Sequence, residues 1–144
     1  MKLYFVFTRK NLAVILAVII AVFILIGQFS SLESAGIDAS TNAKRVLFLQ
    51  GLGYEVDETA TEIKDIVIPE NFSAVYEKYN NLQKQAGFDL KNYRGKNAKV
   101  YSYSLQNDTE KQIHLIVCED RLIGGDVASL KLNGNMTGLK RKNE

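Results

Sequence analysis

The sequence predicts an α+β protein, in which an N-terminal transmembrane helix precedes a small domain of two helices packed on a mostly antiparallel sheet of about five strands. Three observations lead to this class. Residues 12–26 form an uninterrupted apolar run. Two later segments have the apolar spacing of helices that keep one face in a core. Several short segments alternate apolar and polar residues between turn residues, as strands do.

The apolar run, LAVILAVIIAVFILI, has no polar side chain, whereas a helix of a soluble domain keeps a polar face. It covers roughly 22 Å, and its flanks extend it towards the ~30 Å of a bilayer core. The nearest small residues suited to signal cleavage, at 34–36, follow the poorly suited Phe29, Leu32 and Glu33. We therefore expect a retained membrane helix over 11–29, with a cleaved signal as the alternative.

Charge around the span predicts its direction. Lys2, Arg9 and Lys10 precede it, and Glu33 and Asp38 follow it. The positive-inside rule then places the N-terminus in the cytoplasm and the C-terminal domain outside the cell membrane. The expected organisation is a cytoplasmic segment 1–10, the membrane helix, a stalk 30–40, a domain 41–139 and a basic tail 140–144.

Small residues recur on one face of the predicted membrane helix. Ala13, Ala17 and Ala21 are spaced by four residues, and such faces let two membrane helices approach closely. The pattern indicates a possible homodimer through this helix.

Charge and cysteine content exclude several classes for the exported part. Three of the 18 basic residues precede the span, which leaves 15 against 16 acidic residues, so we expect no nucleic-acid partner. A single cysteine, Cys118, rules out an internal disulfide and suits a bacterial envelope. The basic tail residues Lys140, Arg141 and Lys142 are expected to fray in solvent.

The first half of the domain predicts a helix, a hairpin and a second helix. Ser40, Thr41 or Asn42 can cap a helix over 43–50 that ends at Gly51 or Gly53. Segments 54–56 and 63–68 are predicted strands that can pair with each other, and a second helix is expected from Pro69 to Ala86. The expected apolar face of the first helix is Ala43, Val46, Leu47, Leu49, Gln50 and Leu52, and that of the second is Phe72, Val75, Tyr76, Tyr79, Leu82 and Ala86.

The second half predicts three strands, over 98–105, 113–117 and 122–132. Lys99, Tyr101, Tyr103 and Leu105 alternate onto one face of the first. The glycine pair at 124–125 within the last predicts a bulge or a close approach of another backbone.

No residue pattern in the domain indicates catalysis, a metal or a cofactor. His114 is the only histidine, and it lies about 13 Å along a strand from Cys118, too far for a catalytic or metal-binding pair. We expect a surface or half-buried sheet histidine and a small apolar cysteine. Glu119, Asp120 and Asp126 form a loose acidic group that we expect on a solvated turn.

The domain resembles an uncharacterised family of clostridial-type Firmicutes proteins. The resemblance covers about residues 43–139 and is carried by IPENFSAVYEKYNNLQKQAGFDLKNYRGKNAKVYSYSL at 68–105 and LIGGDVASLKLNGNMTGL at 122–139. It implies a membrane segment followed by a domain of unknown function, and it supplies no activity or catalytic residues.

The resulting hypothesis is a non-enzymatic binding or interaction module of the cell envelope, associated with the bilayer and with an envelope protein partner. Two alternatives stay open: a hydrolase of envelope polymers that uses the acidic group, and a small-ligand sensor that uses Tyr101 and Tyr103. The candidate binding residues are polar or flexible positions that lie between apolar segments. They are Tyr93, Arg94, Lys96, Gly124, Gly125 and Asp126.

Overall fold

The computed structural model describes residues 36–142, which lie in one compact unit, Gly36–Glu144. The predicted membrane helix over 11–29, with its face of Ala13, Ala17 and Ala21, lies outside the described residues. Within the described part of the chain, the helices are too short or too polar to span a bilayer.

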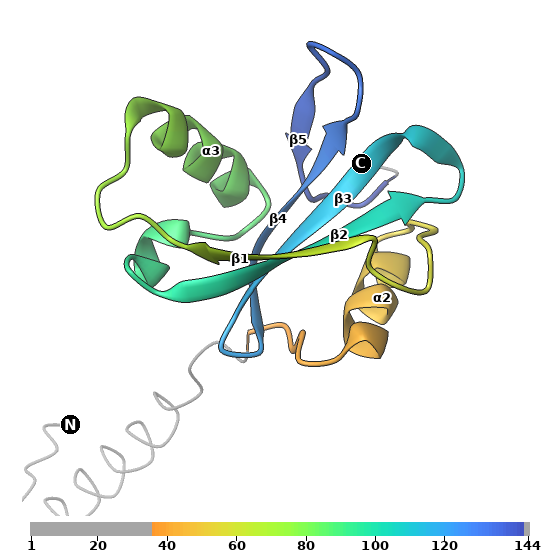
Figure 1. Cartoon of the computed structure of the whole chain (residues 1–144), viewed down its shortest axis with the longest axis horizontal. Coiled ribbons are helices and arrows are strands. Elements are labelled where there is room, and N and C mark those ends of the chain that lie inside the picture. The colour runs from red at the N-terminus through yellow and green to blue at the C-terminus, as the bar shows by residue number, and fades with distance from the viewer. Residues whose placement is uncertain (1–35, 143–144) are drawn as a thin grey trace, which may run out of the picture. The chain divides into compact units, whose positions relative to one another are not determined.

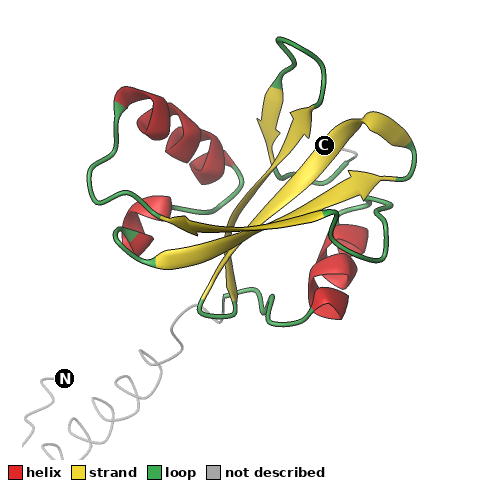
Figure 2. Cartoon of the chain, in the orientation of Figure 1, coloured by secondary structure: helices red, strands yellow, loops and turns green. Residues whose placement is uncertain are grey.

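Five antiparallel strands form one sheet in sequence order (Figures 1 and 2). Tight turns join β2 to β3 and β3 to β4. Glu119 and Asp120 form the second turn with φ of 50° and 63°, which suits the right-handed twist of a hairpin. The predicted α+β class and antiparallel sheet are confirmed. The strands are β1 (Glu62–Val67), β2 (Asn97–Leu105), β3 (Asp108–Cys118), β4 (Arg121–Ser129) and β5 (Met136–Gly138).

Helices α2 (Asn42–Gly51) and α3 (Ala74–Gln85) cover opposite faces of this sheet (Figure 1). Because neighbouring strand residues point to opposite faces, β3 contributes to two cores. Leu115 packs in the cluster that contains Leu49 of α2, whereas Ile116 packs in the cluster that Tyr76 of α3 covers. A short 3-10 helix, η1 (Leu90–Tyr93), closes the second cluster.

The predicted hairpin between 54–56 and 63–68 is wrong. Val56 forms only an isolated bridge to Leu105, whereas β1 pairs with β2 from Asn97 to Ser102. Both segments thus lie along the same edge of β2, one after the other. Because they follow one another along this edge, they do not lie side by side and do not pair with each other.

Several element boundaries also differ from the prediction, and β3 begins at Asp108 and not at residue 113. Helix α3 begins at Ala74 and not at Pro69, because the hydroxyl of Ser73 accepts a hydrogen bond from the Tyr76 N–H and caps it. The last predicted strand ends at Ser129, and the chain turns through Asn133, which has φ 65°, into β5. Strand β5 was not predicted.

The predicted apolar faces of the helices are partly wrong. Leu47 of α2 is 68% exposed and Val75 of α3 is 78% exposed. The side chains that α3 buries completely are the polar Asn80 and Gln83, and α2 buries Arg45 beside Leu49. Buried polar groups need hydrogen-bond partners, so these residues point to the interior polar contacts of the domain.

Candidate functional site

Helix α3 sits on the glycine pair of β4 through a buried glutamine. The Oε1 of Gln83 accepts a hydrogen bond of 2.8 Å from the Gly125 N–H. A Cβ on Gly124 would lie 2.9 Å from the same oxygen, so the absence of a side chain permits the contact. The ladder between β3 and β4 shifts register beside this pair, between Ile116 and Val117. Of the two predicted alternatives, the register shift supports the bulge, whereas the group that approaches the pair from α3 is a side chain and not another backbone.

Asp126 follows the glycine pair and is also a candidate binding residue. It is buried in a polar network. Its Oδ2 accepts from the Tyr79 hydroxyl at 2.7 Å, and its Oδ1 lies 2.9 Å from Nδ1 of His114. Because a carboxylate can only accept, Nδ1 carries the hydrogen. Burial, together with the nearby Asp126 carboxylate, raises the pKa of Tyr79 far above its usual range. The expectation that Asp126 lies on a solvated turn is wrong.

This network does not form a catalytic arrangement. The Nε2 of His114 lies 3.4 Å from the amide oxygen of Gln112, where a nucleophile would have to stand. Cys118 is buried in the core cluster between the sheet and α3, here called the α3-side core. Burial raises the pKa of its thiol, which opposes formation of a reactive thiolate. His114 is half-buried, as predicted.

The three carboxylates named for a hydrolase are not brought together. Glu119 and Asp120 lie on the exposed β3–β4 turn, where Glu119 pairs with Lys96 at 3.0 Å. Asp126 is six residues along the strand from Asp120, which corresponds to roughly 20 Å. Within residues 36–142, no group of three histidine, cysteine or acidic side chains is placed to hold a metal ion.

The loop residues Tyr93, Arg94 and Lys96 lie around the end of η1. The Tyr93 ring packs on the α3-side core, the Arg94 guanidinium lies 5.3 Å from the Phe72 ring centre, and Lys96 is held by Glu119. They therefore occupy the β3–β4 turn end of the sheet. Asp126 lies beneath α3, so the structure does not join the two predicted groups into one site.

The two tyrosines considered for a sensor pocket are engaged by helix α2. Arg45 places its guanidinium 3.6 Å from the centre of the Tyr101 ring and donates from Nε to the Tyr103 hydroxyl at 3.0 Å. Tyr103 has no exposed surface. Tyr103 belongs to the core cluster on the α2 side of the sheet, and Tyr101 packs against it.

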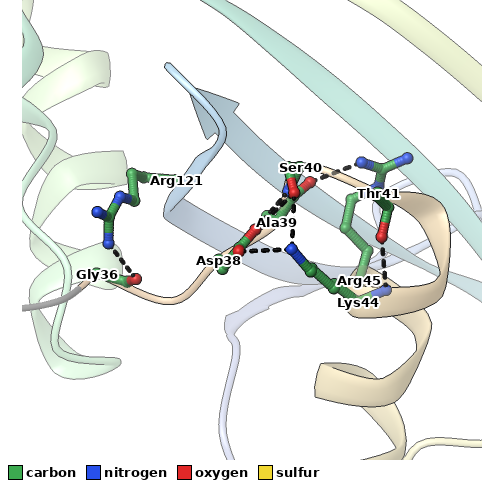
Figure 3. A network of polar contacts seen from close by, with 8 residues as sticks. All are labelled: Gly36, Asp38, Ala39, Ser40, Thr41, Lys44, Arg45 and Arg121. Atoms are coloured by element: carbon green, nitrogen blue, oxygen red, sulfur yellow. Dashed lines mark hydrogen bonds and ion pairs between the residues drawn. The ribbon is translucent and has the colours of Figure 1, made fainter.

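Arg45 also binds Ala39, close to the first residue that the structure describes (Figure 3). Its Nη1 donates to the Ala39 carbonyl at 2.7 Å. Close by, Arg121 donates to the Gly36 carbonyl at 2.8 Å, and Lys44 donates to Asp38 at 2.6 Å. Lys44, with help from Ser40, holds the pKa of Asp38 far below its usual range. Residues 36–40 are thus fixed to β4 and α2.

An open cleft lies on the opposite end of the domain, between the β2–β3 turn, the β4–β5 hairpin and the C-terminal residues. Its volume is about 770 Å³, within the range of small-molecule sites. Its apolar lining consists of Leu82, Leu105, Val127 and Met136, and its polar lining includes Gln85, Asn107, Ser129, Asn135 and Thr137. None of the six predicted binding residues lines it.

Lys140, Arg141 and Lys142 of the basic tail form one wall of the cleft, here called the tail wall. The Lys140 carbonyl accepts from the Tyr54 hydroxyl at 2.8 Å, and the Lys142 N–H donates to the Leu52 carbonyl at 3.0 Å. The expectation that the tail frays is therefore wrong as far as Lys142. Lys140, Arg141 and Lys142 all line the cleft, and none forms an ion pair with another residue of 36–142.

The other charges in the cleft are those of Lys111, Asp108 and Glu55. Lys111 lies 2.8 Å from Asp108, whereas Glu55 accepts from the neutral Asn107 amide and forms no ion pair within residues 36–142. A smaller hollow of about 450 Å³ adjoins the cleft and shares Lys140 and Arg141 with it. The available positive charge is therefore concentrated on the tail wall.

The fold and the cleft define a small α+β domain with helices on both faces of an antiparallel sheet and an open cleft at one end. The chain belongs to the family described as Domain of unknown function (DUF4830), whose model matches residues 48–127. The matched part includes the buried Asp126 network, whereas β5 and the tail lie beyond it. No curated protein and no solved structure matches the chain significantly. The resemblance to a domain of unknown function is confirmed.

Proposed function

We propose that the chain is a membrane-anchored, extracytoplasmic and non-enzymatic binding module, and that its ligand is a small anion with an apolar body. The observation that carries the proposal is the composition of the cleft. Apolar side chains form part of its lining, and three cations without ion-pair partners among residues 36–142 stand on one wall. A ligand that combines an apolar group with a carboxylate, phosphate or sulfonate matches both features.

Hydrogen bonds hold the backbone that carries the cations of the tail wall, which favours binding over random solvent exposure. Tyr54 fixes the backbone at Lys140, and Leu52 fixes it at Lys142. Because the tail backbone is already ordered, ligand binding costs less conformational entropy.

The anchored and extracytoplasmic parts of the proposal rest on the apolar run 12–26 and on the basic residues Lys2, Arg9 and Lys10 before it. The resemblance to clostridial-type Firmicutes proteins supports the same placement. Protease added to intact bacterial cells that express the full chain is expected to remove the domain. Full protection in intact cells, with cleavage after lysis, would contradict the orientation.

Binding can be tested on the full chain in nanodiscs of zwitterionic lipid. The probes are naphthalene-2-sulfonate and its uncharged sulfonamide, with affinities measured by saturation-transfer NMR. Exposed charge pairs contribute about 0.2–1 kcal/mol each. Changing Lys140, Arg141 and Lys142 together to Gln should thus weaken sulfonate binding about tenfold, with little effect on the sulfonamide.

The matched control changes Lys78 and Arg94 to Gln, because both lie on the exposed surface away from the cleft. It should leave both affinities unchanged. Met136→Asp should weaken both probes, since it places a charge in the apolar lining. Equal loss of sulfonate binding in the tail variant and in the control would overturn the proposed site.

A further inference from the structure

Strand β1 ends the sheet with one edge free. It pairs with β2 on one side, and it has no other strand partner among residues 36–142 (Figure 1). Its pairing is in continuous register from Glu62 to Val67, without a bulge or a proline inside the strand. Bulges and prolines are common devices that prevent a strand edge from pairing further.

The backbone groups on the free edge belong to alternate residues. The Ile68 N–H donates to the Lys96 carbonyl at 2.9 Å, and these residues continue the register in which Val67 faces Asn97. In an antiparallel ladder, hydrogen-bonded residues alternate with residues that turn their groups outward. The even-numbered residues of β1 therefore bond to β2, and Ile63, Asp65 and Val67 turn their N–H and C=O groups to the free edge.

These three residues also carry exposed side chains on one face. Ile63 is 58% exposed and Val67 is 59% exposed. They lie two residues before and two residues after Asp65, so the apolar positions are placed symmetrically around it. The Asp65 carboxylate accepts from Nζ of Lys99 on β2 at 2.5 Å.

We propose that two copies of the chain pair through their β1 strands, antiparallel and around a two-fold axis at Asp65, so that their sheets become continuous. This register places Ile63 of each copy opposite Val67 of the other. It also makes all three outward residues hydrogen-bonded positions of the new ladder. An isologous contact of this kind requires a patch that complements itself, and β1 has that property around Asp65 alone.

The proposed register is specific for two copies, because a neighbouring register loses the match. A shift of the axis to Lys64 would place Ile63 opposite Asp65 and would set the two Lys64 side chains against each other. In the proposed register the only like charges that face each other are the two Asp65 carboxylates, each already paired with its own Lys99. Removal of that charge should strengthen the dimer.

Disulfide trapping on the full chain in detergent micelles tests the register. In the proposed dimer the two Asp65 Cα atoms lie about 5.5 Å apart, within reach of a disulfide. Asp65→Cys should therefore form a covalent dimer rapidly under mild oxidation. Glu62→Cys is the matched control on the same strand, because the two Glu62 positions would lie roughly 20 Å apart. Native Cys118 is buried, so the wild-type chain sets the background.

A mixed experiment makes the test independent of any association through the membrane helix. Ile63→Cys and Val67→Cys should each give little dimer alone and should cross-link efficiently when mixed. Adding Asp65→Asn to both should raise the yield of the mixed dimer severalfold. The proposal is overturned if Asp65→Cys reacts no faster than Glu62→Cys, or if the mixture gives no more dimer than either variant alone.

Discussion

The hydroxyl of Tyr79 donates a hydrogen bond of 2.7 Å to Oδ2 of Asp126, across the interface between α3 and the sheet. The two residues lie 47 positions apart in the chain. Asp126 is 2% exposed, and its other oxygen bonds to His114 of β3. One carboxylate thus connects α3, β3 and β4. Its partners make this network a structural element of the domain.

Replacement of Asp126 by Ala should destabilise the domain by about 3 kcal/mol, because the partly buried Tyr79 hydroxyl and His114 N–H would both lose their acceptor. Urea unfolding followed by circular dichroism measures the change. Asp57→Ala is the control, since Asp57 is exposed, and it should change stability by less than about 0.5 kcal/mol. Equal effects of the two substitutions would show that the network contributes nothing.

Gly125→Ala should cost about 1–3 kcal/mol through overpacking. The new Cβ would lie 2.8 Å from the backbone oxygen of His114, which cannot move without disturbing the ladder. At Gly51, the last residue of α2, a Cβ has no atom within 4 Å. Gly51→Ala should instead stabilise the protein by about 0.5 kcal/mol, since alanine restricts the unfolded chain. Thermal unfolding of both variants checks the opposite signs.

Arg45→Lys should destabilise the domain by about 2 kcal/mol although the charge is kept. A lysine cannot reproduce both the donation to Tyr103 and the planar stacking on Tyr101. Arg94→Lys changes an exposed guanidinium and should be close to neutral. Urea midpoints of the two variants test this, and a neutral Arg45→Lys would show that the hydrogen-bond geometry at Arg45 is unimportant.

Asp89 should make stability depend on pH in the acidic range. The Asn80 amide donates to its carboxylate at 2.9 Å, and together with the Lys91 N–H and Lys84 it lowers the pKa of Asp89. The unfolded chain, with an ordinary pKa of about 3.9, then binds more protons than the folded protein in this range. The contribution is complete above about pH 5 and is lost as pH falls through the lowered pKa.

Comparison of wild type with Asp89→Asn tests that dependence. The difference between their urea midpoints should be larger at pH 7 than at pH 3, where the wild-type carboxylate begins to take up its proton. Asp57→Asn provides the background for an exposed carboxylate. A difference that stays the same at both pH values would contradict the role given to Asp89.

Much of the fold follows from local patterns in the sequence. Alternation over 98–105 and 113–117 gives each strand two partly apolar faces, so the sheet needs cover on both sides, and the two predicted helices supply it. Thr41 caps α2, one of the three residues expected to do so. These features depend on neighbours within a few positions, which is why the sequence alone predicts them.

The sequence by itself therefore determined the α+β class, most strand positions and the irregularity at the glycine pair. The tertiary structure decided that Asp126 and Arg45 are buried, that Val56 pairs with Leu105 and that the tail forms a wall of the cleft. In each case the partner lies far away in the chain. A polar side chain viewed locally is expected in solvent, and only a distant hydrogen-bond partner makes its burial favourable.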